Sequence, residues 1–355
     1  MLSFLKLHYP IQHVYFSSEL LATLFHSMIA PETKCTVPCN LCGSTDVAEI
    51  GRVDRNNRPL RTVICQRCGL AWSDPRPNAE EVKKFYSEEY RILYKGAYSP
   101  KLKHVYRAGK IAVERYSFLK DVIKPDDRVL DIGAGGGEFV YLMRKLGFDA
   151  RGIEPNEGYG LYAKRELELP VEVGFAQGIE LPENFFHIVT LHHVMEHLDD
   201  PSLILTRIRN ALCDGGLLIV EVPNIEGKCF APSHRFHVAH LYSFNAQTLE
   251  AMGRKCGFAV HNTTVSPDGG VITTMFRKAE GAETATGALP GNCERIINTL
   301  KRHTTLSHYA TLNPYVRPVR RLRMRADETL ATRNLADGKA VLDHIISERI
   351  GRRTD

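Results

Sequence analysis

Arg128-Val129-Leu130-Asp131-Ile132 is a short apolar run with one acid, and Gly133-Ala134-Gly135-Gly136-Gly137 follows it directly. The run is typical of a buried strand, and Glu138-Phe139-Val140-Tyr141 after the glycines is typical of the start of a helix. Glycines are needed where the chain turns sharply and a ligand approaches the backbone closely. The segment therefore predicts a strand, a ligand-binding turn and a helix.

The surrounding residues, 126–280, alternate short apolar strands with helical stretches. This alternation indicates an α/β fold with a doubly wound, Rossmann-like and mainly parallel sheet. The next strand, Asp149–Glu154, ends in a carboxylate that can accept hydrogen bonds from both hydroxyls of a ribose. A glycine-rich turn alone also fits a dinucleotide cofactor, so the turn by itself leaves the ligand open.

Five segments resemble class I S-adenosylmethionine-dependent methyltransferases, in particular the bacterial enzymes that act on small molecules. They are VLDIGAGGGEF, GIEPN, HHVMEHLDDP, LCDGGLLIVEVPN and HLYSFNAQTLEAMGRKCGF, within residues 126–265. The resemblance implies that the glycine turn lines the methionine end of the cofactor and that Glu154 holds its ribose. The implied cofactor-binding residues are Asp131, Gly133, Ala134, Gly135, Gly137, Glu154, Pro155, Phe175, Ala176 and His192. The chain departs from the family at Phe186-His187, where relatives have Phe-Asp, and lacks the usual acid near the adenine.

The histidine-rich segment His192–His197 follows the predicted strand 188–191. Ligands of open α/β sheets bind at this carboxyl edge, so we expect the methyl acceptor nearby. A hydroxyl acceptor benefits from a base that titrates near neutral pH. His193 and His197 are the leading candidates, and His237 and His240, in a predicted loop that covers the acceptor, are the second. Two alternatives stay open: the Glu-His pair only orients the loop or touches the cofactor, or the segment is a zinc-peptidase motif, which requires a long helix and a third ligand.

Two Cys-x-x-Cys-Gly knuckles, Cys39 with Cys42 and Cys65 with Cys68, lie within residues 35–75. Four thiolates on two knuckles are typical of a closed, tetrahedral, structural zinc site. A redox pair is the alternative. A zinc ribbon in front of this kind of domain also resembles some sugar methyltransferases. The ribbon is expected either to form one wall of the acceptor site or to brace the fold.

The rest of the chain divides into an N-terminal extension (1–34), a helical connector (76–125), and a linker with a basic helical tail (281–355). From residue 291 onward there are thirteen Lys or Arg against seven Asp or Glu, although the net charge of the chain is only +5. This tail is interpreted either as a solvated face or as a docking surface for an anionic partner. No uncharged run approaches the roughly 20 residues that span a bilayer. A cytoplasmic location is therefore expected.

The main hypothesis is methyl transfer to a small molecule or glycan, with a nucleotide-linked sugar or polysaccharide hydroxyl favoured. One alternative is a methyltransferase of ribosomal or transfer RNA that uses the zinc module to bind RNA. A second is a non-catalytic scaffold that binds S-adenosylmethionine. Nucleic acid is the less favoured partner, and the sequence leaves the oligomeric state open.

Overall fold

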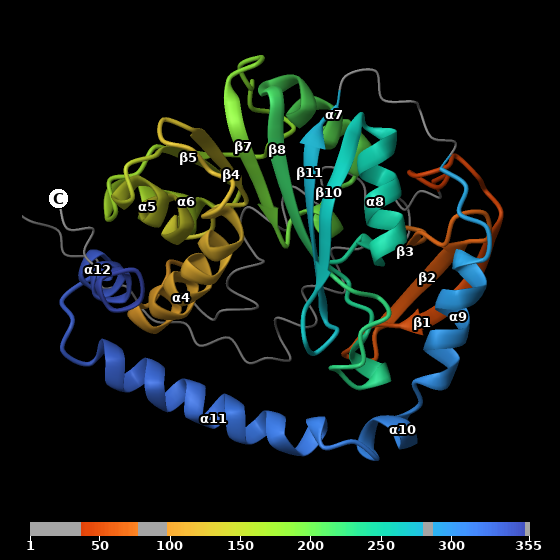
Figure 1. The fold of residues 1–355 in the computed structure, drawn as a ribbon. Helices are drawn as coiled ribbons and strands as arrows, with labels where there is room; N and C mark the ends of the chain where they lie inside the picture. The colour runs from red at the N-terminus through yellow and green to blue at the C-terminus, as the bar shows by residue number, and fades with distance from the viewer. Residues whose placement is uncertain (1–36, 77–97, 280–286, 352–355) are drawn as a thin grey trace, which may run out of the picture.

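A seven-stranded sheet forms the centre of the molecule (Figure 1). The computed structural model describes residues 37–76, 98–279 and 287–351. The strand order is β10-β11-β8-β7-β4-β5-β6. The strands are β4 (Arg128–Ile132), β5 (Asp149–Glu154), β6 (Val171–Val173), β7 (Phe186–His192), β8 (Leu212–Pro223), β10 (Phe258–Val265) and β11 (Val271–Lys278). Only β11 runs opposite to the other strands: it pairs antiparallel with β8 and β10, and all the other pairings are parallel. The predicted doubly wound, mainly parallel sheet is therefore confirmed.

Helices cover both faces of this sheet, which explains why its strands are apolar on both sides. Val129 of β4 packs in one core with α4 (Leu102–Leu119), α5 (Glu138–Lys145) and α12 (Gly338–Arg349). Leu130 and Ile132 of the same strand pack in the other core, with α7 (Pro201–Ala211) and α8 (Ala246–Lys255). The α6 helix (Glu157–Arg165) follows β5.

The described part of the predicted helical connector (76–125) contains α4, which packs against α12 from the far end of the chain. Gly109 lies at this contact. A Cβ atom there would be 2.7 Å from Leu342 Cδ2 and 2.8 Å from Ile345 Cδ1. The two helices approach closely because residue 109 has no side chain. The expected extension at residues 1–34 lies outside the described residues.

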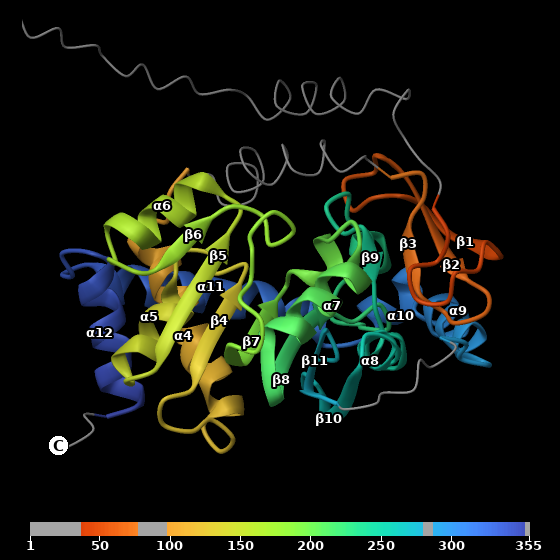
Figure 2. The same cartoon turned by 90° about the horizontal axis from the view of Figure 1, so that it is seen from above.

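The cysteine knuckles belong to a second, four-stranded sheet of order β1-β2-β3-β9. Its strands are β1 (Val47–Val53), β2 (Pro59–Cys65), β3 (Ala71–Ser73) and β9 (Tyr242–Ser243). The strands β1 and β2 form a hairpin between the two knuckles, whereas β9 comes from the segment after β8 and pairs with β3. The segment that follows β8 of the larger sheet therefore supplies the last strand of the smaller one, and both views place the module opposite α12 (Figure 2).

The C-terminal region is helical, as predicted, and it packs against the cysteine module at one end and against α4 at the other. It consists of α9 (Asn292–Arg302), α10 (Thr305–Tyr309), α11 (Asn313–Thr332) and α12. Cys293 and Ile296 of α9 pack with Ile64 and Ala71 of the cysteine module. No helix among the described residues is both long and apolar enough to cross a membrane.

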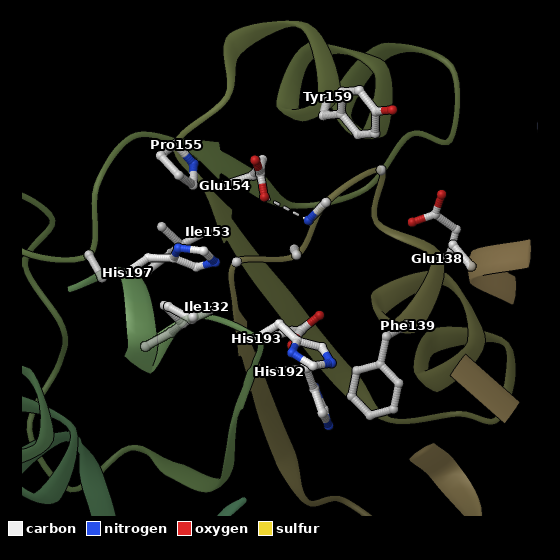
Figure 3. Close-up of a pocket in the computed structure, with 18 of the residues that line it drawn as sticks. Ile132, Glu138, Phe139, Ile153, Glu154, Pro155, Tyr159, His192, His193 and His197 are labelled. Atoms are coloured by element: carbon white, nitrogen blue, oxygen red, sulfur yellow. Dashed lines mark hydrogen bonds and ion pairs between the residues drawn. The ribbon is translucent and has the colours of Figure 1, made fainter. Parts of the chain in front are cut away.

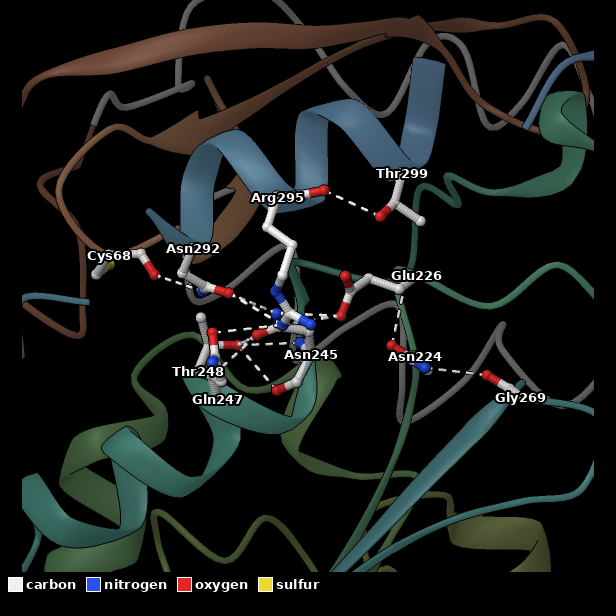
Figure 4. Close-up of polar contacts among 10 residues, drawn as sticks. All are labelled: Cys68, Asn224, Glu226, Asn245, Gln247, Thr248, Gly269, Asn292, Arg295 and Thr299. Carbon is white, nitrogen blue, oxygen red and sulfur yellow. Dashed lines mark hydrogen bonds and ion pairs between the residues drawn. The ribbon is translucent and has the colours of Figure 1, made fainter. Parts of the chain in front are cut away.

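A buried amide network fixes α9 to the second cysteine knuckle (Figure 4). Asn292, which is 2% exposed, donates to the carbonyl oxygen of Cys68 at 2.8 Å and accepts from Asn245 Nδ2 at 2.8 Å. Asn245 also donates to Glu226, and Arg295 pairs with the same carboxylate at 3.2 Å. The knuckle is therefore held by groups from three distant parts of the chain.

The Asn292→Ala variant should unfold at lower urea concentration than the wild type. The substitution removes the partners of a buried carbonyl and a buried amide, and each unsatisfied group costs about 1–3 kcal/mol. Equilibrium urea unfolding measures the loss. Thr299→Ala on the same helix is the control, because the Thr299 hydroxyl is exposed and bonds only within the helix. Equal stability of the two variants would contradict a bracing role for Asn292.

Candidate functional site

The glycine turn after β4 requires glycine at each odd position. Gly133, Gly135 and Gly137 all have positive φ, at 79°, 60° and 85°. A Cβ atom on Gly133 would lie 2.4 Å from Val194 Cγ2, and one on Gly137 would lie 2.6 Å from Leu169 Cδ1. Side chains other than hydrogen would therefore strain the backbone and collide with packed neighbours.

Glu154, at the end of β5, is 2% exposed and faces the turn (Figure 3). Its Oε2 accepts a hydrogen bond from the Gly135 amide at 2.7 Å, and its Oε1 accepts one from the Asn156 amide at 3.1 Å. A carboxylate has about four acceptor positions, so both oxygens can accept further hydroxyl donors.

Asp131 is buried inside β4 and is held by its neighbour in β7. It accepts a hydrogen bond from the Thr190 hydroxyl at 2.6 Å, and its Oδ1 lies 3.6 Å from His192 Nδ1. Burial lowers the pKa of His192, and the charge of Arg115 adds to this effect. His192 is therefore neutral at neutral pH, beside the carboxyl group of Asp131.

A cavity of about 410 Å³ lies over the glycine turn. It is lined by all the predicted cofactor-binding residues except Gly137, which lies behind the turn as the N-cap of α5. The other wall of this cavity was not predicted from the sequence, and most of it is formed by α4. Its residues include His104, Ala108, Ile111, Ala112 and Arg115 of α4, together with Glu138, Phe139 and Tyr159. The apolar spacing of α4 predicted a helix but gave no signal of which ligand its polar side chains would face.

His193 lies between two carboxylates, and its backbone has the unusual φ of 56°. Its Nδ1 is 3.4 Å from Glu196 Oε1, and its Nε2 is 3.3 Å from Glu221 Oε1. Arg115 of α4 holds Glu221 at 3.0 Å. Burial lowers the pKa of His193, but the hydrogen bond to Glu196 and the charges of both carboxylates outweigh burial, so the pKa is raised.

A second cavity, of about 380 Å³, adjoins the first, and His193 and His197 line both. It also contains His237 and His240, so the structure brings all four candidate histidines together. Two arginines reach it from different directions. Arg55 comes from the turn between β1 and β2, where its amide donates to the Phe236 carbonyl at 2.9 Å, and Arg235 comes from the 232–240 loop.

The four histidines differ in charge and orientation. His197 Nδ1 lies 2.7 Å from the Ala239 carbonyl oxygen, so Nδ1 carries the proton and Nε2 is left as an acceptor. Burial lowers the pKa of His237 to about 3 and that of His240 well below its ordinary value, and nearby cationic groups lower both further. His237 and His240 are therefore neutral, and Glu196 is the buried carboxyl group beside them.

The zinc-peptidase interpretation of His193, Glu196 and His197 is wrong, because the local helix is a single 3-10 turn, Met195–His197. A long helix would be needed to place two histidines on one face. The third group that lies beside Glu196 and His197 is His240, and not His193. One ligand atom each from Glu196, His197 and His240 lies within 4.8 Å of the others, so this cluster has the composition of a small cation site as well as of a proton-binding site.

The four knuckle cysteines meet at one point. Cys39 Sγ is 3.4 Å from Cys68 Sγ, Cys42 Sγ is 3.4 Å from Cys65 Sγ, and all four sulfurs lie within 4.8 Å of one another. Tetrahedral thiolates around zinc are separated by about 3.8 Å. The donor set and its spacing therefore fit a zinc ion held by four cysteines.

Comparison with known families identifies residues 103–263, somewhat less than half of the chain, as a match to a methyltransferase domain family. The matched segment includes the glycine turn, Asp131, Glu154 and all four candidate histidines. The methyltransferase class predicted for this region is thereby confirmed.

Curated relatives match shorter stretches. A ubiquinone biosynthesis O-methyltransferase of Azorhizobium caulinodans is 34% identical over 109 residues, which are 29% of this chain and 43% of that protein. An uncharacterized 37.1 kDa protein in a Streptomyces fradiae transposon is 27% identical over 192 residues, or 49% and 54% of the two chains. The chain thus spans less than half the length of the ubiquinone methyltransferases it matches. Among solved structures, an S-adenosylmethionine-dependent methyltransferase described as putative, from Listeria monocytogenes, is 16% identical with a TM-score of 0.40, covering 48% of this chain and all of that one.

Proposed function

We propose that the chain is an S-adenosylmethionine-dependent methyltransferase that methylates a hydroxyl group of a small anionic acceptor. The observation that carries the proposal is the meeting of two cavities at His193 and His197. One cavity has the glycine turn and an acid-tipped strand, and the other has histidines and arginines. The cofactor would occupy the first, and the acceptor the second.

The residues of the first cavity fit the cofactor by their chemistry. The glycine turn presents bare backbone to the cavity at Gly133, Gly135 and Gly136, and Glu154 presents a buried carboxyl group beside it. Glu154 would accept hydrogen bonds from the two ribose hydroxyls, and His192, Phe175 and Ala176 would contact the rest of the molecule. S-adenosylmethionine supplies a methyl group already activated on a sulfonium, so the protein has mainly to align the acceptor and exclude water.

His193 is proposed as the base that takes the acceptor proton. With its Nδ1 hydrogen directed at Glu196, the Nε2 atom is left to receive the proton. The resulting imidazolium would be stabilised by Glu221, which lies 3.3 Å from Nε2 and is itself held by Arg115. This is the arrangement in which a carboxylate orients a histidine base and stabilises its charged form.

Two features support an anionic acceptor, for which a nucleotide-linked sugar remains the favoured class. Arg55 and Arg235 both line the second cavity, and two of its histidines are neutral, so its charge is mainly positive. Guanidinium groups bind phosphate oxygens well. Oxygen is the favoured methylated atom because the relative from Azorhizobium caulinodans is named as an O-methyltransferase.

The direct test is transfer of radiolabelled methyl groups to nucleotide-linked sugars, polysaccharides, phenolic metabolites and RNA. We expect label in a small anionic hydroxyl compound. Label in RNA, with binding that weakens steeply as salt rises, would instead support the RNA methyltransferase alternative. Cofactor binding without transfer to any fraction would favour the scaffold alternative.

Glu154→Ala should weaken S-adenosylmethionine binding by about 10- to 100-fold, because two charge-assisted hydrogen bonds to the ribose are worth roughly 1.5–3 kcal/mol each before compensation. Isothermal titration calorimetry measures the dissociation constant. Glu157→Ala, at the exposed start of α6, is the control. Unchanged affinity of Glu154→Ala would refute the proposed ribose contact.

We also propose that Cys39, Cys42, Cys65 and Cys68 hold a structural zinc ion. A closed four-cysteine site has no open position for a substrate, so zinc would stabilise the module without taking part in methyl transfer. The module would contribute to the acceptor site through Arg55. It would then both brace the fold and form part of one wall of that site.

A further inference from the structure

The α11 helix has an apolar stripe on its outer side. At 100° per residue its members lie within about a third of the helix circumference, and they are 46–79% exposed: Leu312 at the N-cap, Tyr315, Val316, Val319, Leu322 and Leu330. A surface helix of a globular protein normally turns such a stripe toward the core. Figure 1 shows α11 running along the outside of the molecule from α10 to α12.

The opposite side of α11 is the side attached to the protein. Glu328 is buried and forms two hydrogen bonds with Arg107 of α4, at 2.6 and 2.7 Å. Arg317 donates to the Cys229 carbonyl at 3.2 Å and lies 3.7 Å from the centre of the Phe230 ring. At 100° per residue, Arg317 and Glu328 point about half a turn away from the centre of the apolar stripe. The stripe therefore faces away from the body because of how the helix is anchored.

Positive charge flanks the stripe. At 100° per residue, Arg320 and Arg325 flank the stripe and Arg323 lies at its edge, whereas Arg321 lies on the side of Glu328. All four are exposed, and none of them forms an ion pair with a carboxylate in the part of the chain that the structure describes. Of the two acids on the helix, Asp327 and Glu328, the second is already paired with Arg107. The outer surface of α11 is thus both apolar and strongly cationic.

We propose that α11 is an interfacial helix that docks the protein on an anionic membrane surface. An interfacial helix lies in the plane of the bilayer boundary, with apolar side chains in the acyl region and arginines at the anionic headgroups. A second copy of this chain fits less well, because facing arginines would repel each other. RNA fits less well because it offers no apolar phase for the stripe. The proposal is independent of which acceptor the second cavity binds.

Docking in this way would have a consequence for the acceptor site. Arg317 contacts Cys229 and Phe230, and both of these residues line the second cavity. The membrane-facing helix is therefore attached directly to one wall of that cavity.

The test is flotation of the full-length protein with vesicles of phosphatidylcholine and phosphatidylglycerol, against vesicles of phosphatidylcholine alone. The wild type should bind the anionic vesicles, and added salt should weaken binding. A double variant, Val319→Gln with Leu322→Gln, should bind at least about tenfold more weakly, because it removes two apolar side chains from the acyl region. Arg320→Gln with Arg323→Gln should lose most of the preference for anionic lipid.

Leu203→Gln is the matched control, since Leu203 is an equally exposed leucine on α7. It should bind vesicles like the wild type. Calorimetry of S-adenosylmethionine binding checks that every variant is folded, because α11 does not line the first cavity. Equal binding of all variants, or no preference for anionic vesicles, would overturn the proposal. So would a dimer, seen by analytical ultracentrifugation, that the stripe variant dissociates, because a second copy would then cover the stripe.

Discussion

The His193→Ala variant should turn over about 10²- to 10⁴-fold more slowly than the wild type while binding S-adenosylmethionine with nearly unchanged affinity. His193 is the one candidate histidine that lines both cavities and lies between two carboxylates. Removing the imidazole leaves the acceptor hydroxyl without a base but leaves the glycine turn and Glu154 intact. Single-turnover methyl transfer, combined with calorimetry of cofactor binding, separates the two effects.

The pH profile gives a readout that a purely structural role would not change. The carboxylates raise the pKa of His193, and the base is active only when it has lost its proton, so activity should increase as pH rises through this raised pKa. Glu196→Gln removes one negative charge beside Nδ1 and should lower that pKa. The rising limb of the profile should therefore move to lower pH in the variant.

The neighbouring histidines provide matched controls for this test. His237→Ala should change acceptor binding more than the pH profile, because burial already keeps His237 neutral. If His197→Ala loses turnover while His193→Ala retains it, the base is the Nε2 atom of His197. If activity of the wild type depends on an added divalent cation while the cysteine module keeps its zinc, a cation at Glu196, His197 and His240 takes part in the reaction.

The parts of the site that the sequence predicts well are those with local signatures. The glycine turn and the two cysteine knuckles depend on residues a few positions apart, where a required turn or a ligand spacing is visible in the order of residues. The cluster of four histidines was predicted in part, because the carboxyl edge of a parallel sheet gathers the segments that follow its strands. The structure adds that His193 lies between Glu196 and Glu221.

The parts that the sequence did not predict all depend on long-range packing. Arg115 reaches Glu221 from α4, which precedes the large sheet in the chain, and Arg55 reaches the second cavity from the cysteine module. Asn292 contacts the Cys68 carbonyl from 224 residues away. Each of these side chains is an ordinary polar residue in its own segment, so its role follows only from which segments pack together.

Loss of one knuckle thiolate should have the largest effect on stability. In the Cys65→Ser variant, we expect loss of bound zinc and a fall in the free energy of unfolding of several kcal/mol, because zinc binding to such sites supplies folding free energy of about 10–16 kcal/mol. The effect should spread beyond the module, because β3 pairs with β9 and Asn292 is bonded to Cys68. Metal analysis of the purified protein and thermal unfolding with and without a chelator measure both quantities.

Cys213→Ser is the control, because Cys213 lies at the start of β8, away from the four-sulfur cluster. It should retain the metal and the wild-type melting temperature. Arg55 extends into the second cavity from the hairpin that zinc would stabilise, so Cys65→Ser should also raise the KM for the acceptor more than that for S-adenosylmethionine. Equal metal content and equal melting temperatures for the two cysteine variants would rule out zinc and leave a redox role for the thiols. A rise in both KM values by the same factor would show that the module braces the whole fold and does not form a wall of the acceptor site.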